Sequence, residues 1–137
     1  MKQKILYSFI VMLLALPALV KAQNPVTPAI SKEWTLLGES PTQYEVSARI
    51  VKCRPDGSVQ MHVEIFNEGV GSQGCHFKIM LTNPATQEKM VKELNHTLGV
   101  GEMIKPSCDN EEKPFLRFNI PAGWNPETIE FTITFIP

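Results

Sequence analysis

The sequence of 137 residues predicts an all-β fold, a single β-sandwich of about seven antiparallel strands preceded by a cleavable signal peptide. Segments in which apolar and polar residues alternate recur at a spacing of roughly 8–12 residues. Turns rich in Gly and Pro separate these segments, and no long stretch has a helical period. Alternation with period two is typical of strands with one face in a core and one in water.

Residues 1–22 have the three parts of a secretory signal peptide. Two lysines form a basic start, an apolar run covers residues 5–20, and a small-x-small cleavage sequence ends at Ala22. A retained membrane anchor is the alternative, but the run is shorter than the roughly 20 residues of a spanning helix and contains Pro17. We therefore expect cleavage after Ala22 and a secreted or periplasmic protein that does not insert into the membrane.

The mature chain is acidic, because the leader holds three of the 13 Lys and Arg residues and none of the 14 Asp and Glu residues. Nucleic acid and anionic membrane surfaces call for clustered basic residues, so we expect neither as a partner. Residues 23–31 carry two prolines and no periodicity, which predicts an extended lead-in. The sandwich domain is expected over residues 32–137.

Residues 43–66 predict a β-hairpin, with apolar side chains at every second position on both sides of an RPDG turn (54–57). A four-residue loop is favoured over a two-residue one, because a proline in the ladder would have no N–H to donate. When residues are paired outward from this turn, the apolar residues of the two strands lie opposite one another on the same face of the hairpin. The predicted pairs are Ile50 with Met61, Ala48 with Val63 and Val46 with Ile65.

Five further strands are expected, at residues 32–37, 75–81, 87–94, 115–120 and 128–136. The stretch 87–94 also fits one turn of helix, but its Lys89, Lys92 and Glu93 are suited to an exposed edge strand, which we favour. Residues 99–113 are polar and are expected to form a loop.

The strand spacing, together with the sequence FNEG (66–69) that closes the third strand, resembles small immunoglobulin-like or fibronectin-like β-sandwich domains of exported bacterial proteins. The resemblance covers the mature chain. It departs from the antibody pattern, because no Trp lies on the third strand and the cysteines are not placed one on each of the second and sixth strands. It implies architecture only.

The three cysteines, Cys53, Cys75 and Cys108, predict one disulfide and one free thiol in an exported protein. Cys75 shares the inward parity of Phe77 and Ile79, which favours a small buried core residue. We therefore predict a Cys53–Cys108 disulfide. A Cys75–Cys108 bridge is the alternative, since a simple immunoglobulin order would place Cys53 and Cys108 at opposite ends of the sandwich.

No catalytic pattern is present in the sequence. It contains no G-x-S-x-G elbow, no phosphate-binding loop, and no Cys–His pair with an orienting third group at a recognisable spacing. We expect an exported module that is not an enzyme and has no cofactor. We expect this module to bind another protein or a surface glycan. Trp34 and Trp124 flank strand ends and are candidates for a binding surface; the alternative is that either one plugs the end of the core.

A periplasmic copper- or zinc-binding protein is the second hypothesis. His62 and His76 are expected to point outward on the third and fourth strands, so pairing of those strands would place both imidazoles on one face. The alternative is a polar sheet face with ordinary cross-strand pairs, and the lack of a third ligand at a fixed spacing favours it.

Overall fold

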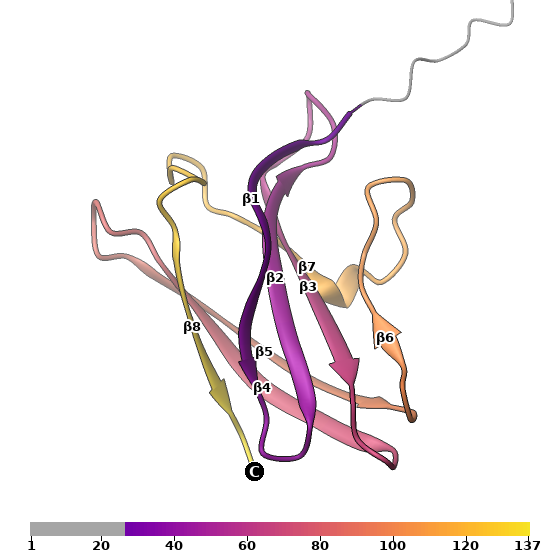
Figure 1. The fold of residues 1–137 in the computed structure, drawn as a ribbon. Coiled ribbons are helices and arrows are strands. Elements are labelled where there is room, and N and C mark those ends of the chain that lie inside the picture. The colour runs from indigo at the N-terminus through magenta and orange to yellow at the C-terminus, as the bar shows by residue number, and fades with distance from the viewer. Residues whose placement is uncertain (1–26) are drawn as a thin grey trace, which may run out of the picture.

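A computed structural model describes residues 27–137 of the chain (Figure 1). The predicted signal peptide falls within residues 1–26 and lies outside the described part. From residue 27 onward the chain is all-β, with a single 3-10 turn and no α-helix. No helix in this part of the chain is long and apolar enough to cross a membrane.

Eight strands form two antiparallel sheets, as a β-sandwich requires. Sheet A has the order β1-β2-β3, and the short strands β6 and β7 pair with the remaining edge of β3. Sheet B has the order β5-β4-β8. The strands are β1 (Ala29–Glu39), β2 (Tyr44–Lys52), β3 (Gln60–Asn67), β4 (Gln73–Thr82), β5 (Lys89–Leu98), β6 (Met103–Ile104), β7 (Arg117–Asn119) and β8 (Glu130–Phe135).

The core lies between the two sheets, and β2, β3 and β4 supply most of it. In Figure 1, β2 and β3 of sheet A lie in front of β4 and β5 of sheet B. Every second side chain of the three central strands is fully buried, which is what period-two alternation produces when two sheets pack face to face. These residues are Val46, Ala48, Ile50, Met61, Val63, Ile65, Cys75, Phe77, Ile79 and Leu81.

The β2–β3 hairpin has the predicted register. Ile50 lies opposite Met61, Ala48 opposite Val63 and Val46 opposite Ile65. The turn is closed by the N–H of Gly57, which donates to the carbonyl oxygen of Arg54 at 3.0 Å. The predicted four-residue turn at 54–57 is therefore present, although the ladder itself ends at the Val51–Gln60 pair.

The first strand begins earlier than predicted. β1 starts at Ala29 rather than at residue 32, so the last three residues of the expected lead-in belong to it. They are strand because β2 is long enough to pair with them: Ala29 lies opposite Lys52, and Ile30 lies opposite Val51. Three register shifts interrupt the β1–β2 ladder.

Strands β6 and β7 are two halves of one edge strand. Met103 and Ile104 pair with Phe66 and Ile65 near the end of β3, whereas β7 pairs with its start. Residues 105–116 are looped out between the halves, and we call them the covering loop. The predicted strand at 115–120 is shorter than expected, because Pro114 starts a 3-10 turn, η1 (Pro114–Leu116), where its fixed φ is favourable.

The ambiguous stretch at 87–94 forms a strand from Lys89 onward and not a helix, whereas residues 87 and 88 belong to the preceding turn. β5 continues to Leu98 and lies at the edge of sheet B. The predicted edge position of Lys89, Lys92 and Glu93 is confirmed.

Candidate functional site

The structure does not bring together the two histidines predicted as metal ligands. His62 is on β3 of sheet A and His76 is on β4 of sheet B; within residues 27–137 these strands do not pair. His76 Nε2 instead donates to Glu93 Oε1 on β5 at 2.6 Å, and this bond lowers the pKa of Glu93. The pair is an ordinary cross-strand contact, which was the alternative interpretation of this position.

His62 faces away from the core, as its parity predicts, but it is not on an open polar face. Its exposed fraction is 0%, because the covering loop folds over the outer side of sheet A. The loop is held there by Arg117, which donates to the carbonyl oxygens of Ser107 and Asn110. Lys105 forms an ion pair with Glu64 at 3.3 Å, which adds a second attachment to β3.

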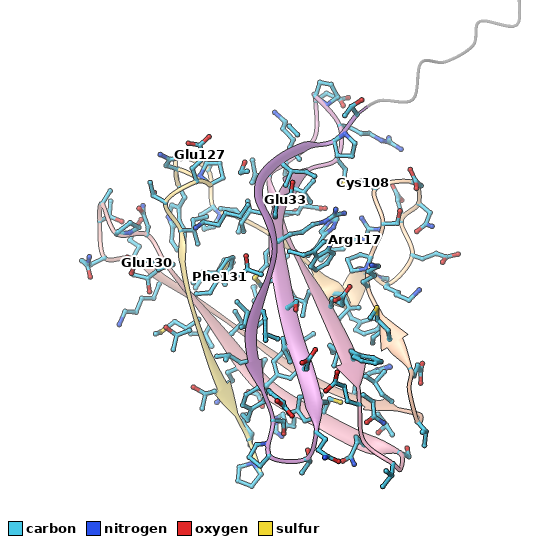
Figure 2. All side chains as sticks on the ribbon, in the orientation of Figure 1. Glu33, Cys108, Arg117, Glu127, Glu130 and Phe131 are labelled. Atoms are coloured by element: carbon cyan, nitrogen blue, oxygen red, sulfur yellow. A yellow bond between two sulfur atoms is a disulfide. The ribbon has the colours of Figure 1, made fainter. Side chains whose placement is uncertain are left out.

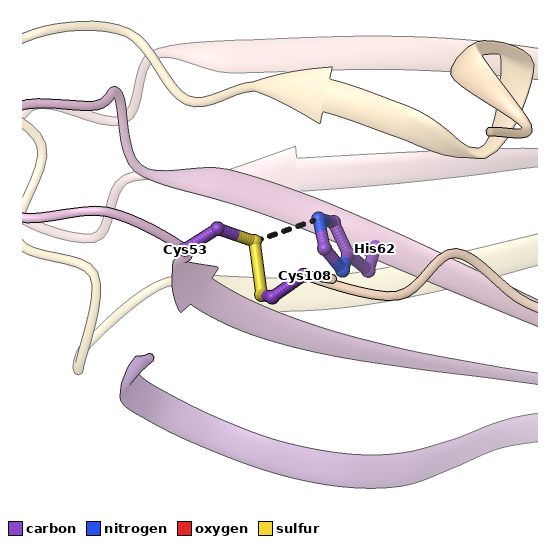
Figure 3. Close-up of side chains that lie close together, drawn as sticks. All are labelled: Cys53, His62 and Cys108. Atoms are coloured by element: carbon purple, nitrogen blue, oxygen red, sulfur yellow. Dashed lines mark hydrogen bonds between the residues drawn. A yellow bond between two sulfur atoms is a disulfide. The ribbon is translucent and has the colours of Figure 1, made fainter. Parts of the chain in front are cut away.

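A disulfide between Cys53 and Cys108 joins the covering loop to the end of β2, beside His62 (Figure 3). The predicted pairing is therefore confirmed, and the alternative Cys75–Cys108 bridge is excluded. Cys75 is a fully buried free thiol in the core, as predicted, and burial raises its pKa to about 11. The disulfide is compatible with an exported protein.

The hydrogen bonds around His62 fix its tautomer. Arg49 Nη2, which is always a donor, lies 3.3 Å from His62 Nδ1, so Nδ1 accepts and Nε2 carries the proton. Nε2 then donates to Gln60 Oε1 at 3.2 Å and lies 3.9 Å from Cys53 Sγ. Burial, with Arg49 and Arg117 nearby, lowers the pKa of His62 to about 4, so the imidazole is neutral at pH 7.

The cluster of Cys53, His62 and Cys108 has the residue types of a metal site, with ligand atoms within 4.8 Å of one another. The atoms that would bind a metal ion are already engaged in other bonds, however. The two sulfur atoms share a covalent bond and are not thiolates, and the free lone pair of His62 accepts the hydrogen bond from Arg49. In this oxidised state the chemistry of the cluster does not suit a cation.

The two tryptophans lie in different surroundings. Trp34 is in the middle of β1, half-buried, with the Arg49 guanidinium 4.9 Å from its ring centroid and the Lys105 ammonium at 5.9 Å. Trp124 is only 9% exposed and packs in the core, where its Nε1 donates to Glu88 at 3.1 Å. Trp124 therefore plugs the core, and neither ring forms an open platform.

The free edges of the two sheets differ in how they are protected against pairing with another chain. Bulges, short strands and charged side chains are the usual protections. On sheet A, β1 carries three register shifts, and the opposite edge consists of the short strands β6 and β7. On sheet B, β5 carries Lys89, Lys92 and Glu93. The β8 sequence, EFTITF, has one charged residue and pairs with β4 without a register shift.

The direction of the β8 amides follows from one hydrogen bond. Ile136 N–H donates to the carbonyl oxygen of His76 in β4 at 2.9 Å. Since successive residues of a strand point their N–H and C=O groups to opposite sides, Thr134 and Thr132 also face β4. Phe131, Ile133 and Phe135 therefore direct their main-chain groups to the free edge.

An open groove of about 660 Å³ runs between this free edge and β1, and we call it the β1–β8 groove. Figure 2 shows Phe131 in the space between the two strands. Farther along β1, Gly38 packs closely on β8: a Cβ at Gly38 would lie 3.2 Å from both Ile133 and Phe135. The groove is lined by Lys32, Thr35, Leu36, Leu37, Thr128, Ile129, Glu130, Phe131 and Thr132.

Comparison of the chain with family models, with curated proteins and with solved structures finds no match. The candidate site therefore rests on the geometry of this chain. Neither the role of Arg49 nor the free β8 edge was predicted from the sequence. The predicted register already placed Arg49 opposite His62, and the sparse charge of residues 128–136 was visible beside the charged stretch 87–94.

Proposed function

We propose that the protein is an exported, non-catalytic, immunoglobulin-like module that binds another exported protein by accepting an extended segment of it along the free edge of β8. The observation that carries the proposal is a nearly uncharged strand edge without a register shift, beside a groove in which Leu36 and Phe131 stand among polar side chains. The other sheet edges in residues 27–137 are protected. The free edge of β8 offers unpaired main-chain donors and acceptors to another strand.

The strand order supports the immunoglobulin-like assignment. β2, β3 and the interrupted strand β6–β7 pair as A, B and E do in that fold, and β4 and β8 pair as C and F do. β5, which follows β4 in the chain and pairs with its other edge, has the position of C′ in variable-type domains, and β1 is an addition at the outer edge of A. In the immunoglobulin fold a G strand pairs with the far edge of F, so an incoming segment along β8 would take the position of G.

The main-chain groups along the β8 edge favour a protein segment over a glycan as the ligand. Phe131, Ile133 and Phe135 direct N–H and C=O groups at alternating spacing to the edge, and only another peptide backbone matches that spacing. Alternate side chains of the bound segment would enter the groove beside Leu36, which is 55% exposed. We therefore expect a ligand of about six residues in which apolar residues alternate with polar ones.

A peptide panel tests the proposal. Synthetic peptides in which Val, Ile or Leu alternates with Thr are titrated into the labelled domain, and binding is measured by fluorescence anisotropy. Thr132→Lys on β8 should weaken binding at least about tenfold, because a lysine on an edge strand opposes pairing. The matched control is Thr97→Lys on β5, an exposed threonine at the opposite edge of the same sheet.

A second pair of variants tests the groove. Leu36→Asp should abolish binding, whereas Val91→Asp on β5, at a site of similar exposure (53%), should leave it unchanged. Equal binding by all four variants would refute the proposal, as would binding to a glycan array with no binding to any peptide. Sedimentation velocity of the protein alone shows whether β8 pairs with a second copy; a dimer abolished by Thr132→Lys would make that copy the occupant.

A further inference from the structure

Each sulfur atom of the Cys53–Cys108 disulfide faces a hydrogen-bond donor. Arg49 Nη2 donates to Cys108 Sγ at 3.8 Å. The protonated Nε2 of His62 lies 3.9 Å from Cys53 Sγ (Figure 3). A disulfide is a weak acceptor and gains little from these donors, whereas a thiolate on Cys108 gains a charge-assisted hydrogen bond from Arg49. The single N–H of His62 is already donated to Gln60.

The surroundings of the Arg49 guanidinium are unfavourable for its charge while the disulfide is intact. It is half-buried, burial lowers its pKa, and its Nε is buried with no hydrogen-bond partner. Within the described residues no carboxylate forms an ion pair with it. In direct contact with it are a neutral imidazole, the ring of Trp34 and a sulfur atom, while Glu33 and Glu64 lie near enough to favour its charged form without forming an ion pair with it. A thiolate on Cys108 would give the guanidinium an anion in direct contact, since a buried charge without a close partner is unfavourable.

The disulfide is also within reach of solvent. Cys53 and Cys108 are both partly exposed and line an open hollow of about 550 Å³, together with Gln60, Arg117 and Asn119. The hollow gives an attacking thiol a route to the bond, and the charges on its wall balance, with Arg54 and Arg117 beside Asp56 and Glu111. Partial exposure and nearby cations are the surroundings in which cysteines react.

We propose that Cys53–Cys108 is an exchange-active disulfide that is reduced by a dithiol entering this hollow, with Cys108 as the leaving thiolate held by Arg49. The thiolate of the dithiol attacks Cys53 Sγ, the bond between the two cysteines breaks, and its electron pair passes to Cys108 Sγ. The second thiol of the dithiol loses its proton to water and attacks the mixed disulfide, which releases Cys53. Two electrons pass to the protein and the dithiol becomes a disulfide; Cys53 takes up one proton from water, Cys108 remains a thiolate beside Arg49, and the other proton of the dithiol stays in the solvent.

This site is independent of strand addition at β8, so the two proposals stand or fall separately. Reduction would release the covering loop from β2 and leave it attached through Arg117 and Lys105.

Dithiothreitol serves as the probe dithiol. The rate of reduction of the folded protein is followed by alkylation and peptide mapping, which separates Cys53 and Cys108 from Cys75. Arg49→Met, which removes the cation and keeps most of the side-chain length, should slow reduction at least about tenfold, because a less stabilised thiolate leaves more slowly. Arg49→Lys should restore most of the rate. Arg54→Met, which removes a cation at the wall of the same hollow without contacting sulfur, should change the rate less than about twofold.

A second measurement needs no variant. The pH dependence of alkylation at Cys108 in the reduced, folded protein should give a thiol pKa at least about one unit below the usual 8.5. A Cys108 pKa of 8.5 or above would overturn the proposal. Reduction of the wild type only at the rate of global unfolding, or equal rates in the wild type and in a folded Arg49→Met variant, would also overturn it.

Discussion

Acidification should destabilise the domain through His62. The folded-state pKa of this residue is about 4, and the ordinary value that applies to the unfolded chain is about 6.5. Between these pH values the unfolded chain binds a proton that the folded protein does not, so the folded state loses stability as the pH falls through this window. A difference of about 2.5 pKa units corresponds to about 3 kcal/mol, lost progressively between pH 6.5 and pH 4.

Urea denaturation between pH 4 and pH 7.5 measures this loss when the wild type is compared with His62→Gln. Glutamine keeps an acceptor for Arg49 and an N–H for Gln60 but does not titrate. The wild type should lose about 3 kcal/mol more than the variant over this range, whereas His76→Gln, a change at the partly exposed His76–Glu93 pair, should follow the wild type. Equal pH slopes in the wild type and His62→Gln would refute the reasoning, as would an NMR titration placing the His62 pKa above 6.

Three further outcomes follow from the core and the cysteines. Val63→Asp should lower the free energy of unfolding by about 3 kcal/mol or more, because it buries an unpaired carboxylate. Val91→Asp, at an exposed site, should lower it by less than about 1 kcal/mol. Similar melting temperatures for the two variants would contradict the burial of Val63. Alkylation without reductant should label only Cys75, rapidly after denaturation and slowly in the native protein; a label on Cys53 would contradict the disulfide. The double variant Cys53→Ala, Cys108→Ala should lose about 4 kcal/mol of unfolding free energy in urea, and a loss below about 1 kcal/mol would contradict the loop-closure estimate.

The hairpin could be predicted because its information is local. Alternating apolar residues and the RPDG turn specify the same register, and a shift of one residue would place core side chains such as Val63 in water. The inward parity of Cys75 was predictable for the same reason. Predicting that the Cys75 side chain faces the core did not require knowing which strands pair with β4.

The burial of His62 could not be predicted, because it depends on contacts distant in sequence. The covering loop is polar and aperiodic, and β6 is a strand of two residues with no pattern to detect. Only the pairing of β6 and β7 with β3 in the folded protein reveals that this loop interrupts an edge strand and folds over sheet A. The last strand was predicted as a strand, but whether one of its edges is free depends on the order of strands in sheet B.

Amide hydrogen exchange along β8 tests the proposed strand addition most directly, because the two sets of amides alternate residue by residue. In the free protein, Thr132 and Thr134 should exchange slowly, since their N–H groups face β4, and Phe131, Ile133 and Phe135 should exchange rapidly. A bound peptide should slow exchange at Phe131, Ile133 and Phe135 and leave the threonines unchanged. Slow exchange at those three amides in the free monomer, or no change on peptide binding, would contradict the account.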